Sequence, residues 1–466
     1  MKKTLLLLAL SAAFLVPFKG FAQDPYTLTP FDGAIFYGMY GETVTEPVPE
    51  GLIRNSNSSY GRMLTQQELD AFGNTLTMTV TLSPLCDNYD RIGNVNIAFV
   101  PKGQTTYTYN EVKRIEIGRF ITPFMRLTNT SVTEVPYVYD LNHLTNVFHD
   151  AALTAVYDIW VELEVYGYQG GPGQGGAAVE IPICANRKDV YMGSLTFEST
   201  TDESIPAPAS SFVTPMSYKY ELKNYTLDGT DVLNETVRTI NVNLDAPVQN
   251  AQLHIITSNH GSNTNGEEYV RRNHYIYFDD ELKLQYKPGG VSCIPFISYN
   301  TQINCIYYVC NGTSNPPQRA DTNAAWSWNN WCPGDKIPNR VVELGDLEAG
   351  HHSYRIEVPE AVFAGDQGYF PMSVYITGEG MNGLVLDKET FLNEAVTLYP
   401  NPVNDNLTIN TGGLNIKTVN VVNTLGQSVY TGTADKIDMT QFQAGIYIVK
   451  ILFDNNQSVV KKVIKE

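Results

Sequence analysis

The sequence has few charged residues and almost no helical periodicity. Asp, Glu, Lys and Arg make up 17% of its 466 residues, and Leu64 to Phe72 is the best short stretch with helical spacing. Beyond the N-terminus, no stretch stays apolar for the roughly 20 residues that a membrane-spanning helix requires. These absences argue against a helical fold and against an integral membrane segment.

Motifs of several common chemistries are also missing. There is no Cys-x-x-Cys pair, so a zinc or redox site is not expected. The histidines are scattered, with His351-His352 as the one adjacent pair, whereas a copper oxygenase would need His-x-His and Met ligands. A Gly-x-Ser-x-Gly nucleophile motif is absent as well. We therefore expect no metal and no cofactor.

The chain has no excess of positive charge with which to bind nucleic acid. Its net charge is −18, and it becomes −21 when Lys2, Lys3 and Lys19 are removed with the N-terminal segment. From residue 394 onward, six lysines balance six acids, so the acidity belongs to residues 23–393. Such a body repels phosphate backbones, whereas a neutral ligand such as a glycan is compatible with it.

The chain begins with the pattern of an export signal. Lys2 and Lys3 precede an apolar run from Leu5 to Val16, and Gly20-Phe21-Ala22 offers small residues for cleavage before Gln23. The run is too short for a membrane anchor. We predict a signal peptide at residues 1–22, and a protein that is exported through the periplasm to be secreted or held at the cell surface.

Six cysteines in an exported chain indicate disulfides. Sequence positions alone leave many connectivities open. Proximity favours two short-range pairs and leaves the third by elimination. The expected pairs are Cys310–Cys332, Cys293–Cys305 and Cys86–Cys184.

Short alternating strands separated by turn residues predict an all-β protein. Thr75 to Leu82 and Tyr157 to Tyr168 each alternate between two faces. Ser, Thr, Pro and Ala are enriched near 200–210, which suggests a boundary between two antiparallel jelly rolls or β-sandwiches, at 23–203 and 204–385. Further strands are expected at Asn94–Val100, Thr239–Leu244, Gln252–Thr257, Tyr275–Tyr286, Ser353–Val358 and Met372–Thr377.

Residues 394–466 are expected to form a separate small unit. They contain Leu398-Tyr399-Pro400-Asn401-Pro402, Asn423-Thr424-Leu425-Gly426-Gln427 and Ala444-Gly445-Ile446-Tyr447-Ile448, and they close with Lys461-Lys462-Val463-Ile464-Lys465. The order and spacing resemble the type A C-terminal sorting domain of the type IX secretion system of Bacteroidetes. The resemblance implies an Ig-like β-sandwich that addresses the chain to the type IX secretion machinery and takes no part in catalysis.

The turn after the strand Thr75–Leu82 contains the most informative motif, Cys86-Asp87-Asn88-Tyr89-Asp90-Arg91, and Ile115-Glu116-Ile117-Gly118-Arg119-Phe120 follows downstream. Together they resemble the peptide:N-glycosidase F family, enzymes that cut N-glycans from asparagine. The resemblance implies that Asp90 is the principal catalytic acid and that Tyr89 and Arg91 bind the substrate, with Arg91 able to orient the carboxylate. The alternative is an ordinary turn aspartate that caps its own backbone.

A second acid lies mid-strand in Trp160-Val161-Glu162-Leu163-Glu164. The resemblance implies that Glu162 belongs to the catalytic set and binds the first sugars, with Trp160 and Glu164 as substrate-binding neighbours. The family has a tryptophan where this chain has Glu164. Alternation along the strand would also produce a plain solvated face here.

The third acid occurs in Gly266-Glu267-Glu268-Tyr269-Val270-Arg271-Arg272. The resemblance selects Glu268 as catalytic and Arg272 as substrate-binding, although Glu267 is an adjacent alternative and the charges could simply belong to a hairpin. Further on, Trp331-Cys332-Pro333-Gly334 resembles another family motif. It implies that Trp331 binds a sugar ring and that Cys332 pairs with Cys310; the alternative is a tryptophan that covers the core.

The resemblance spans roughly residues 26–380 and implies a secreted amidohydrolase that acts on N-linked glycopeptides and glycoproteins. It would cleave the bond between asparagine and the first N-acetylglucosamine and leave aspartate. Asp90, Glu268 and Glu162 are then expected to meet in a groove between the two jelly rolls. Two other functions stay open: a non-catalytic carbohydrate-binding protein or adhesin, and an endoglycosidase that cuts between the two core sugars.

Overall fold

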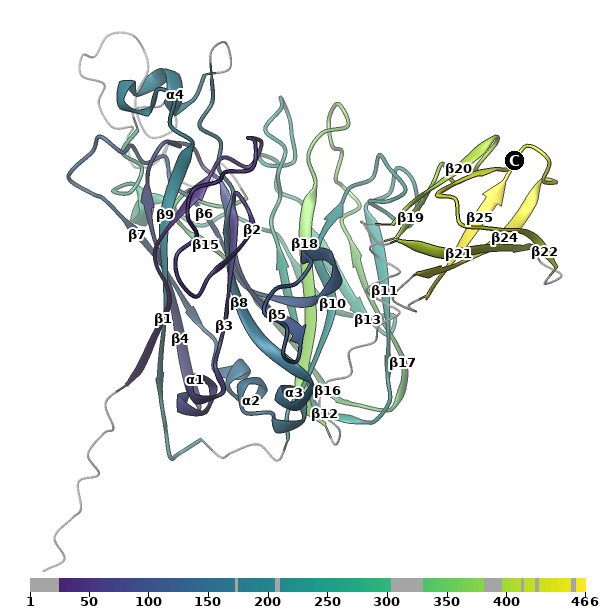
Figure 1. The fold of residues 1–466 in the computed structure, drawn as a ribbon, viewed down its shortest axis with the longest axis horizontal. Coiled ribbons are helices and arrows are strands. Elements are labelled where there is room, and N and C mark those ends of the chain that lie inside the picture. The colour runs from purple at the N-terminus through teal and green to yellow at the C-terminus, as the bar shows by residue number, and fades with distance from the viewer. Residues whose placement is uncertain are drawn as a thin grey trace, which may run out of the picture.

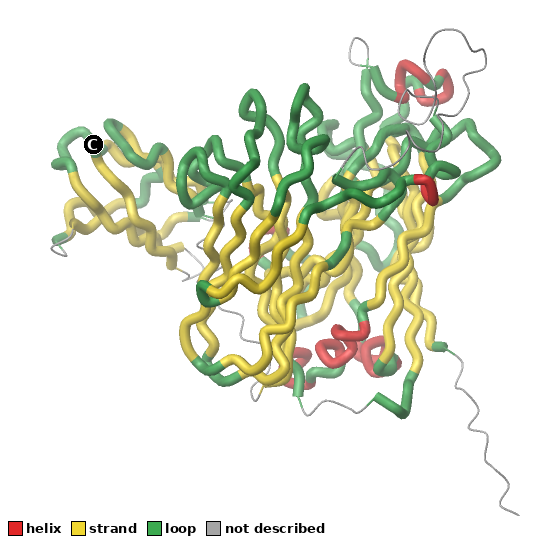
Figure 2. The backbone as a smooth tube through the Cα atoms, turned by 180° about the vertical axis from the view of Figure 1, so that it is seen from behind, coloured by secondary structure: helices red, strands yellow, loops and turns green. Residues whose placement is uncertain are grey.

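The computed structural model describes residues 25–171, 175–205, 210–302, 330–380, 396–411, 415–423, 427–453 and 458–466. The predicted signal peptide lies outside these ranges. Within them the chain is built from antiparallel strands with a few short helices (Figure 1, Figure 2). The predicted all-β class is confirmed. No helix in these ranges is both long enough and apolar enough to cross a membrane.

The first β-sandwich packs a four-stranded sheet on a six-stranded one. In order, the four strands are β1 (Tyr26–Tyr37), β9 (Asp189–Thr200), β4 (Thr75–Pro84) and β7 (Val135–Asp140). The six are β15 (Lys336–Ile337), β6 (Lys113–Ile121), β5 (Ile92–Pro101), β8 (Tyr157–Val165), β3 (Ser59–Met63) and β2 (Ile53–Ser56). Leu76, Met78, Val80 and Leu82 of β4 are buried in its core, as the alternation predicts. Strand β15 comes from the second half of the chain, so this sheet already joins the two halves.

The second β-sandwich packs two four-stranded sheets. One contains β10 (Phe212–Leu222), β18 (Phe370–Gly380), β12 (Val248–Thr257) and β16 (Arg340–Leu347). The other contains β11 (Val237–Leu244), β17 (Gly350–Glu357), β13 (His274–Phe278) and β14 (Glu281–Tyr286). Its apolar core is separate from that of the first sandwich and includes Ile240, Ile276, Ile356 and Met372.

The prediction of one long strand over Tyr275–Tyr286 is wrong. The segment folds into the hairpin β13–β14, and the chain reverses at Asp279 and Asp280, whose φ angles are +49° and +63°. Aspartate tolerates this left-handed conformation better than most residues, and two such residues in succession suit a tight hairpin turn. Three consecutive acids, Asp279, Asp280 and Glu281, separate the two apolar stretches at this turn.

Helices are short and lie at the ends of strands. The stretch predicted to be helical forms α1 (Gln66–Ala71), and Thr65 and Glu68 close its first turn with a reciprocal capping box. The remaining helices are α2 (Thr145–Phe148), α3 (Ala151–Val156), α4 (Ala177–Glu180) and the 3₁₀ turns η1 (Tyr109–Glu111), η2 (Asn142–Leu144), η3 (Pro182–Cys184) and η4 (Ile294–Phe296).

The two sandwiches meet through polar side chains as well as apolar ones. The six-stranded sheet of the first turns its outer face toward the sheet that contains β10 and β18. Arg119 of β6 donates to the Pro371 carbonyl at 2.6 Å and to Ser258 Oγ at 2.9 Å, and Asn96 of β5 donates to Tyr218 Oη at 2.8 Å. Side chains far apart in sequence are therefore fixed relative to one another across this junction.

The C-terminal unit has its own two sheets and its own core. One sheet contains β19 (Thr397–Tyr399), β20 (Asn406–Asn410) and β23 (Lys436–Asp438); the other contains β22 (Ser428–Gly432), β21 (Ile416–Asn423), β24 (Gly445–Phe453) and β25 (Ser458–Lys465). A small β-sandwich is what the sorting-domain resemblance implies.

The domain boundaries at 203/204, 385 and 394 stay predictions; strand β9 ends at Thr200 and β10 begins at Phe212.

Candidate active site

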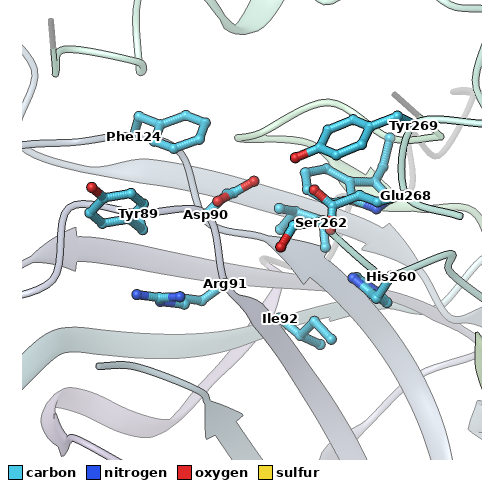
Figure 3. Close-up of a pocket in the computed structure, with 11 residues that line it drawn as sticks. Tyr89, Asp90, Arg91, Ile92, Phe124, His260, Ser262, Glu268 and Tyr269 are labelled. Atoms are coloured by element: carbon cyan, nitrogen blue, oxygen red, sulfur yellow. The ribbon is translucent and has the colours of Figure 1, made fainter. Parts of the chain in front are cut away.

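A cavity of about 380 Å³ is lined by residues of both halves of the chain (Figure 3). Asp90 and Glu268 point into it from opposite walls. Its volume lies in the range of roughly 300–1,000 Å³ that is common for small-molecule sites. The first half contributes Tyr89, Asp90, Arg91, Ile92, Ile121 and Phe124, and the second half contributes His260, Ser262, Glu268, Tyr269 and Trp331.

The turn that carries Asp90 is held by hydrogen bonds to its backbone. The Tyr89 carbonyl accepts from Thr122 Oγ1 and from Tyr191 Oη, each at 2.8 Å, and the Arg91 amide donates to Thr122 Oγ1 at 2.7 Å. The disulfide between Cys86 and Cys184 ties the start of the turn to η3. This pairing is the one that elimination predicts. The turn therefore presents the Asp90 carboxyl from a fixed backbone.

Arg91 lines the cavity but binds Asp87 rather than Asp90. Its Nε lies 2.7 Å from Asp87 Oδ2, and the fully buried Asp87 also accepts from the amides of Tyr89 and Tyr168. The expectation that Arg91 orients the Asp90 carboxylate directly is corrected here. A buried carboxylate needs paired donors, and Asp87 recruits the guanidinium first. The Arg91 side chain stays 27% exposed and is one of the residues that line the cavity.

Burial raises the pKa of both cavity acids, and a neighbouring carboxylate adds to the rise in each case. For Asp90, burial raises the pKa to about 6 and the charge of Asp87 adds to the rise, while Arg91 opposes it. For Glu268, burial and then the charge of Asp90 raise the pKa to about 7, against hydrogen bonds from Gly261 and Tyr269. Each carboxyl group therefore gains or loses its proton near neutral pH, as groups that act in acid–base catalysis do.

The structure distinguishes Glu268 from its neighbour Glu267. Glu267 is fully buried and accepts from Arg272 Nη2 at 2.9 Å and from the Val362 amide at 2.8 Å. Asn330 Nδ2 donates to the carbonyls of both glutamates at 2.8 Å, which fixes this stretch so that Glu268 faces the cavity. Arg272 is held in an ion pair with Glu267 and does not line this cavity, so its substrate-binding role stays a prediction.

Aromatic rings form much of the cavity wall. Trp331 is 7% exposed, and its indole Nε1 donates to the Asn259 carbonyl at 3.0 Å, so its ring is anchored rather than mobile. Tyr89 lies on the opposite side of the cavity with Phe124, at a centroid separation of 6.0 Å. Tyr269 is 39% exposed. Such faces pack well against the apolar faces of sugar rings.

The disulfide next to Trp331 differs from both short-range predictions. Cys332 is bonded to Cys293, with the two Cα atoms 5.4 Å apart, so neither Cys310–Cys332 nor Cys293–Cys305 is correct. Cys305 and Cys310 lie outside the described residues. The fold brings η4 onto the Trp331 loop, where Asn300 Nδ2 donates to the Pro333 carbonyl at 3.0 Å. Proximity in sequence gave no indication of this long-range contact.

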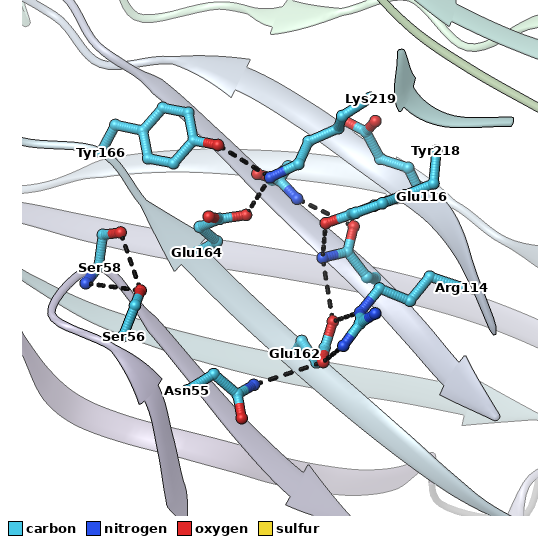
Figure 4. Close-up of polar contacts among 12 residues, drawn as sticks. Asn55, Ser56, Ser58, Arg114, Glu116, Glu162, Glu164, Tyr166, Tyr218 and Lys219 are labelled. Atoms are coloured by element: carbon cyan, nitrogen blue, oxygen red, sulfur yellow. Dashed lines mark hydrogen bonds and ion pairs between the residues drawn. The ribbon is translucent and has the colours of Figure 1, made fainter. Parts of the chain in front are cut away.

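Glu162 is not among the residues that line this cavity. Its side chain is fully buried, and Arg114 donates to it through Nε at 2.7 Å and through Nη2 at 2.9 Å (Figure 4). Tyr107 and Asn96 donate to the same carboxylate. The expected meeting of three acids in one cleft is therefore reduced to two, because an arginine on β6, two strands away in the same sheet, captures the third.

The two neighbours of Glu162 on β8 are also buried instead of lining the cavity. Glu164 is paired with Lys219 of β10, across the junction between the sandwiches (Figure 4). Trp160 is 3% exposed and packs edge-on against Tyr107 at 5.3 Å. The predictions that Trp160 and Glu164 bind substrate are not supported by this arrangement. The loop that carries Tyr107 and the strand β10 cover this part of the sheet.

Six cavity residues were not singled out from the sequence: Ile92, Ile121, Phe124, His260, Ser262 and Tyr269. Tyr269 had a signal, because it directly follows Glu268. His260 packs against the Trp331 ring, and its Nε2 shares a hydrogen bond of 2.7 Å with Ser258 Oγ. Burial and the charge of Arg119 lower the pKa of His260 to about 3. It is therefore a neutral wall residue at ordinary pH.

Among the residues the structure describes, no group of three or more His, Cys, Asp or Glu side chains could hold a metal ion.

Comparison with known proteins gives matches over most of the chain. Residues 32–167 match the family model described as Peptide-N-glycosidase F, N terminal, and residues 230–377 match Peptide-N-glycosidase F, C terminal. Residues 397–466 match the Secretion system C-terminal sorting domain. Asp90 lies within the first matched segment, and His260 and Glu268 lie within the second.

Solved structures share the fold at low sequence identity. The structure of PNGF-II aligns with a TM-score of 0.54 and 18% identity over 77% of this chain and 66% of that chain. PNGase F, a glycosylasparaginase from Flavobacterium meningosepticum, aligns with a TM-score of 0.46 and 15% identity over 78% of this chain and 98% of that one. Among curated proteins, an endo-acting ulvan lyase of Formosa agariphila is 32% identical over 89 residues, which are 18% of this chain and 17% of the lyase. The chain thus spans just under two thirds of PNGF-II and a small part of the lyase.

Proposed function

The chain belongs to the peptide-N-glycosidase F family, and on this premise we propose that it hydrolyses the amide bond between asparagine and the first N-acetylglucosamine of N-linked glycans. The observation that carries the proposal is the pair Asp90 and Glu268. These acids come from the two halves that match the two family models, share one aromatic-walled cavity, and both have a raised pKa.

The reaction requires water to add to the side-chain carbonyl carbon of asparagine. Asp90, as the carboxylate, accepts a proton from that water as the new C–O bond forms. Glu268 positions the water, and the exposed part of Arg91 stabilises the oxyanion that develops on the carbonyl oxygen. The C–N bond then breaks, and the nitrogen leaves as the glycosylamine after taking up the proton that Asp90 accepted from water, while the peptide keeps an aspartate. Residues 397–466 act in export and take no part in this chemistry.

The two raised pKa values predict a bell-shaped pH dependence. Below about pH 6 Asp90 is protonated and accepts no proton from water, so kcat/KM falls. Above about pH 7 Glu268 is also ionised, and its charge opposes the developing oxyanion, so kcat/KM falls again. A pH–rate profile measures both limbs. Glu268→Gln should remove the alkaline limb and keep the acid limb; a profile that stays flat from pH 5 to 9 contradicts the assignment.

One mass spectrum distinguishes the proposed reaction from its alternatives. After incubation of the protein with a purified N-glycopeptide, we expect the peptide to be freed of all sugar and its asparagine to be converted to aspartate. A peptide that keeps one N-acetylglucosamine would indicate an endoglycosidase. An unchanged glycopeptide that still binds the protein would indicate a carbohydrate-binding protein without turnover.

The sorting domain directs the protein through the type IX secretion system to the cell surface or beyond. We propose that its substrates are therefore glycoproteins outside the cell. A net charge of −18 is compatible with such neutral or weakly charged ligands.

A further inference from the structure

A second cavity, of about 200 Å³, lies beside the loop that follows β1. Glu42 and Val44 of this loop line it, together with Asn57, Gln169 and Lys188. None of these residues belongs to the Asp90 cavity. The lining combines an amide, a carboxylate and an amine, which between them offer both donors and acceptors.

The loop is held in place before any ligand arrives. Asn57 Nδ2 donates to the carbonyls of Gly38 and Glu42, each at 3.0 Å, and Asn57 Oδ1 accepts from the Val44 amide at 3.0 Å. Gln169 Oε1 is buried and has no hydrogen-bond partner. A Cβ at Gly38 would lie 2.0 Å from this oxygen, so glycine leaves the room that Gln169 occupies. The cavity is thus preformed, and an acceptor without a donor is buried in its wall.

An exposed aromatic ring borders this second cavity. Tyr40 belongs to the same loop, is 77% exposed, and meets the Tyr168 ring edge-on at a centroid distance of 5.9 Å. Tyr168 precedes Gln169 in the chain, so the ring pair and the unpaired amide oxygen are adjacent. A tyrosine face next to hydrogen-bonding groups suits a pyranose ring, whose C–H face packs on the aromatic ring while its hydroxyls bind the polar groups.

Short chains of contacts connect the second cavity to the first. The Tyr168 amide donates to Asp87 Oδ2 at 2.7 Å, and Asp87 holds Arg91, which lines the Asp90 cavity. On the other side, Tyr369 pairs through its backbone with His260, another residue of the Asp90 cavity. Burial raises the pKa of Tyr369 to about 12, and the charges of Glu221, Tyr166 and then Tyr40 add to the rise. Tyr40 is therefore close to Tyr369. The second cavity is therefore linked by short chains of contacts to residues that line the first.

We propose that Tyr40, Tyr168 and the cavity around Gln169 form a distal carbohydrate subsite, which binds a neutral sugar of the glycan beyond the residues next to asparagine. This rests on the proposed function, because it assumes that the first sugars occupy the Asp90 cavity. Glu42 and Lys188 have opposite charges, so the subsite has no net preference for an anionic sugar. The subsite makes the enzyme favour long glycans over truncated ones.

The test compares two substrates that share one peptide. One substrate carries only the two core N-acetylglucosamines, and the other carries a complete high-mannose glycan. We expect Tyr40→Ala and Gln169→Leu each to lower kcat/KM by about fivefold on the high-mannose glycopeptide, mainly through KM, and to leave the short substrate unchanged. Tyr399→Ala is the matched control, since Tyr399 is 53% exposed in the sorting domain.

Each outcome decides the proposal. Equal losses on both substrates, or no loss on either, overturn it. If the wild-type protein cleaves neither substrate, the catalytic proposal has failed, and calorimetry with the free high-mannose glycan then tests the subsite by itself. Binding that Tyr40→Ala weakens supports the subsite; binding that is absent, or that this substitution leaves unchanged, overturns it.

Discussion

Replacement of Asp90 by Asn is expected to lower kcat/KM for glycopeptide hydrolysis by about 10²–10⁴-fold, the usual contribution of a general base. Asparagine has nearly the same shape as aspartate but cannot accept the proton of the attacking water. The backbone of the turn is held by Thr122 and Tyr191 rather than by the Asp90 side chain, so the geometry of the cavity is preserved. The measurement is steady-state kinetics on a purified glycopeptide.

The Asp90→Asn variant should also be at least as stable as the wild type at pH 8. The folded-state pKa of Asp90 is raised to about 6, so this group stabilises the fold most at low pH and loses that contribution as the pH rises through about 6. Removing its charge relieves the cost at alkaline pH. Full activity of the Asp90→Asn variant would refute the catalytic role.

The second large effect concerns stability. Glu162→Gln is expected to lower the free energy of unfolding by about 3–5 kcal/mol, because it leaves Arg114 buried without its counter-charge. The side chains of this pair are 0% and 2% exposed, so solvent cannot replace the lost partner. Denaturant unfolding at pH 7 measures the change, and Glu198→Gln is the surface control, because Glu198 is an exposed residue of β9.

A double variant shows whether the ion pair is the cause. Glu162→Gln combined with Arg114→Met removes both charges, and it should recover a large part of the stability that the single change loses. In the folded fraction of the single variant, KM should stay unchanged. A Glu162→Gln protein with wild-type stability and a raised KM would instead support the sugar-binding role that the family resemblance implies.

Much of the fold could be predicted from local patterns. The alternation of Leu76, Met78, Val80 and Leu82 indicates a half-buried strand, and β4 buries these residues as expected. The motif around Asp90 located the turn that lines the cavity. These inferences worked because each depends on residues that are neighbours in sequence and that share one strand face or one turn.

The errors arose where a distant segment supplies the partner. Arg114 captures Glu162, and Lys219 captures Glu164. The Cys293–Cys332 bond likewise depends on how two loops pack. A charged residue in a motif looks the same whether it faces a ligand or a buried counter-ion, and pairing across the junction of two sandwiches leaves no local signal.

The central claim is that water attacks the amide carbonyl of asparagine in the Asp90–Glu268 cavity, and hydrolysis in ¹⁸O-labelled water tests it most directly. The account predicts a sugar-free peptide whose new aspartate carries one ¹⁸O in its carboxyl group, formed by the wild type and nearly absent with Asp90→Asn. A released peptide that retains its asparagine, or whose aspartate carries no label, would contradict the claim.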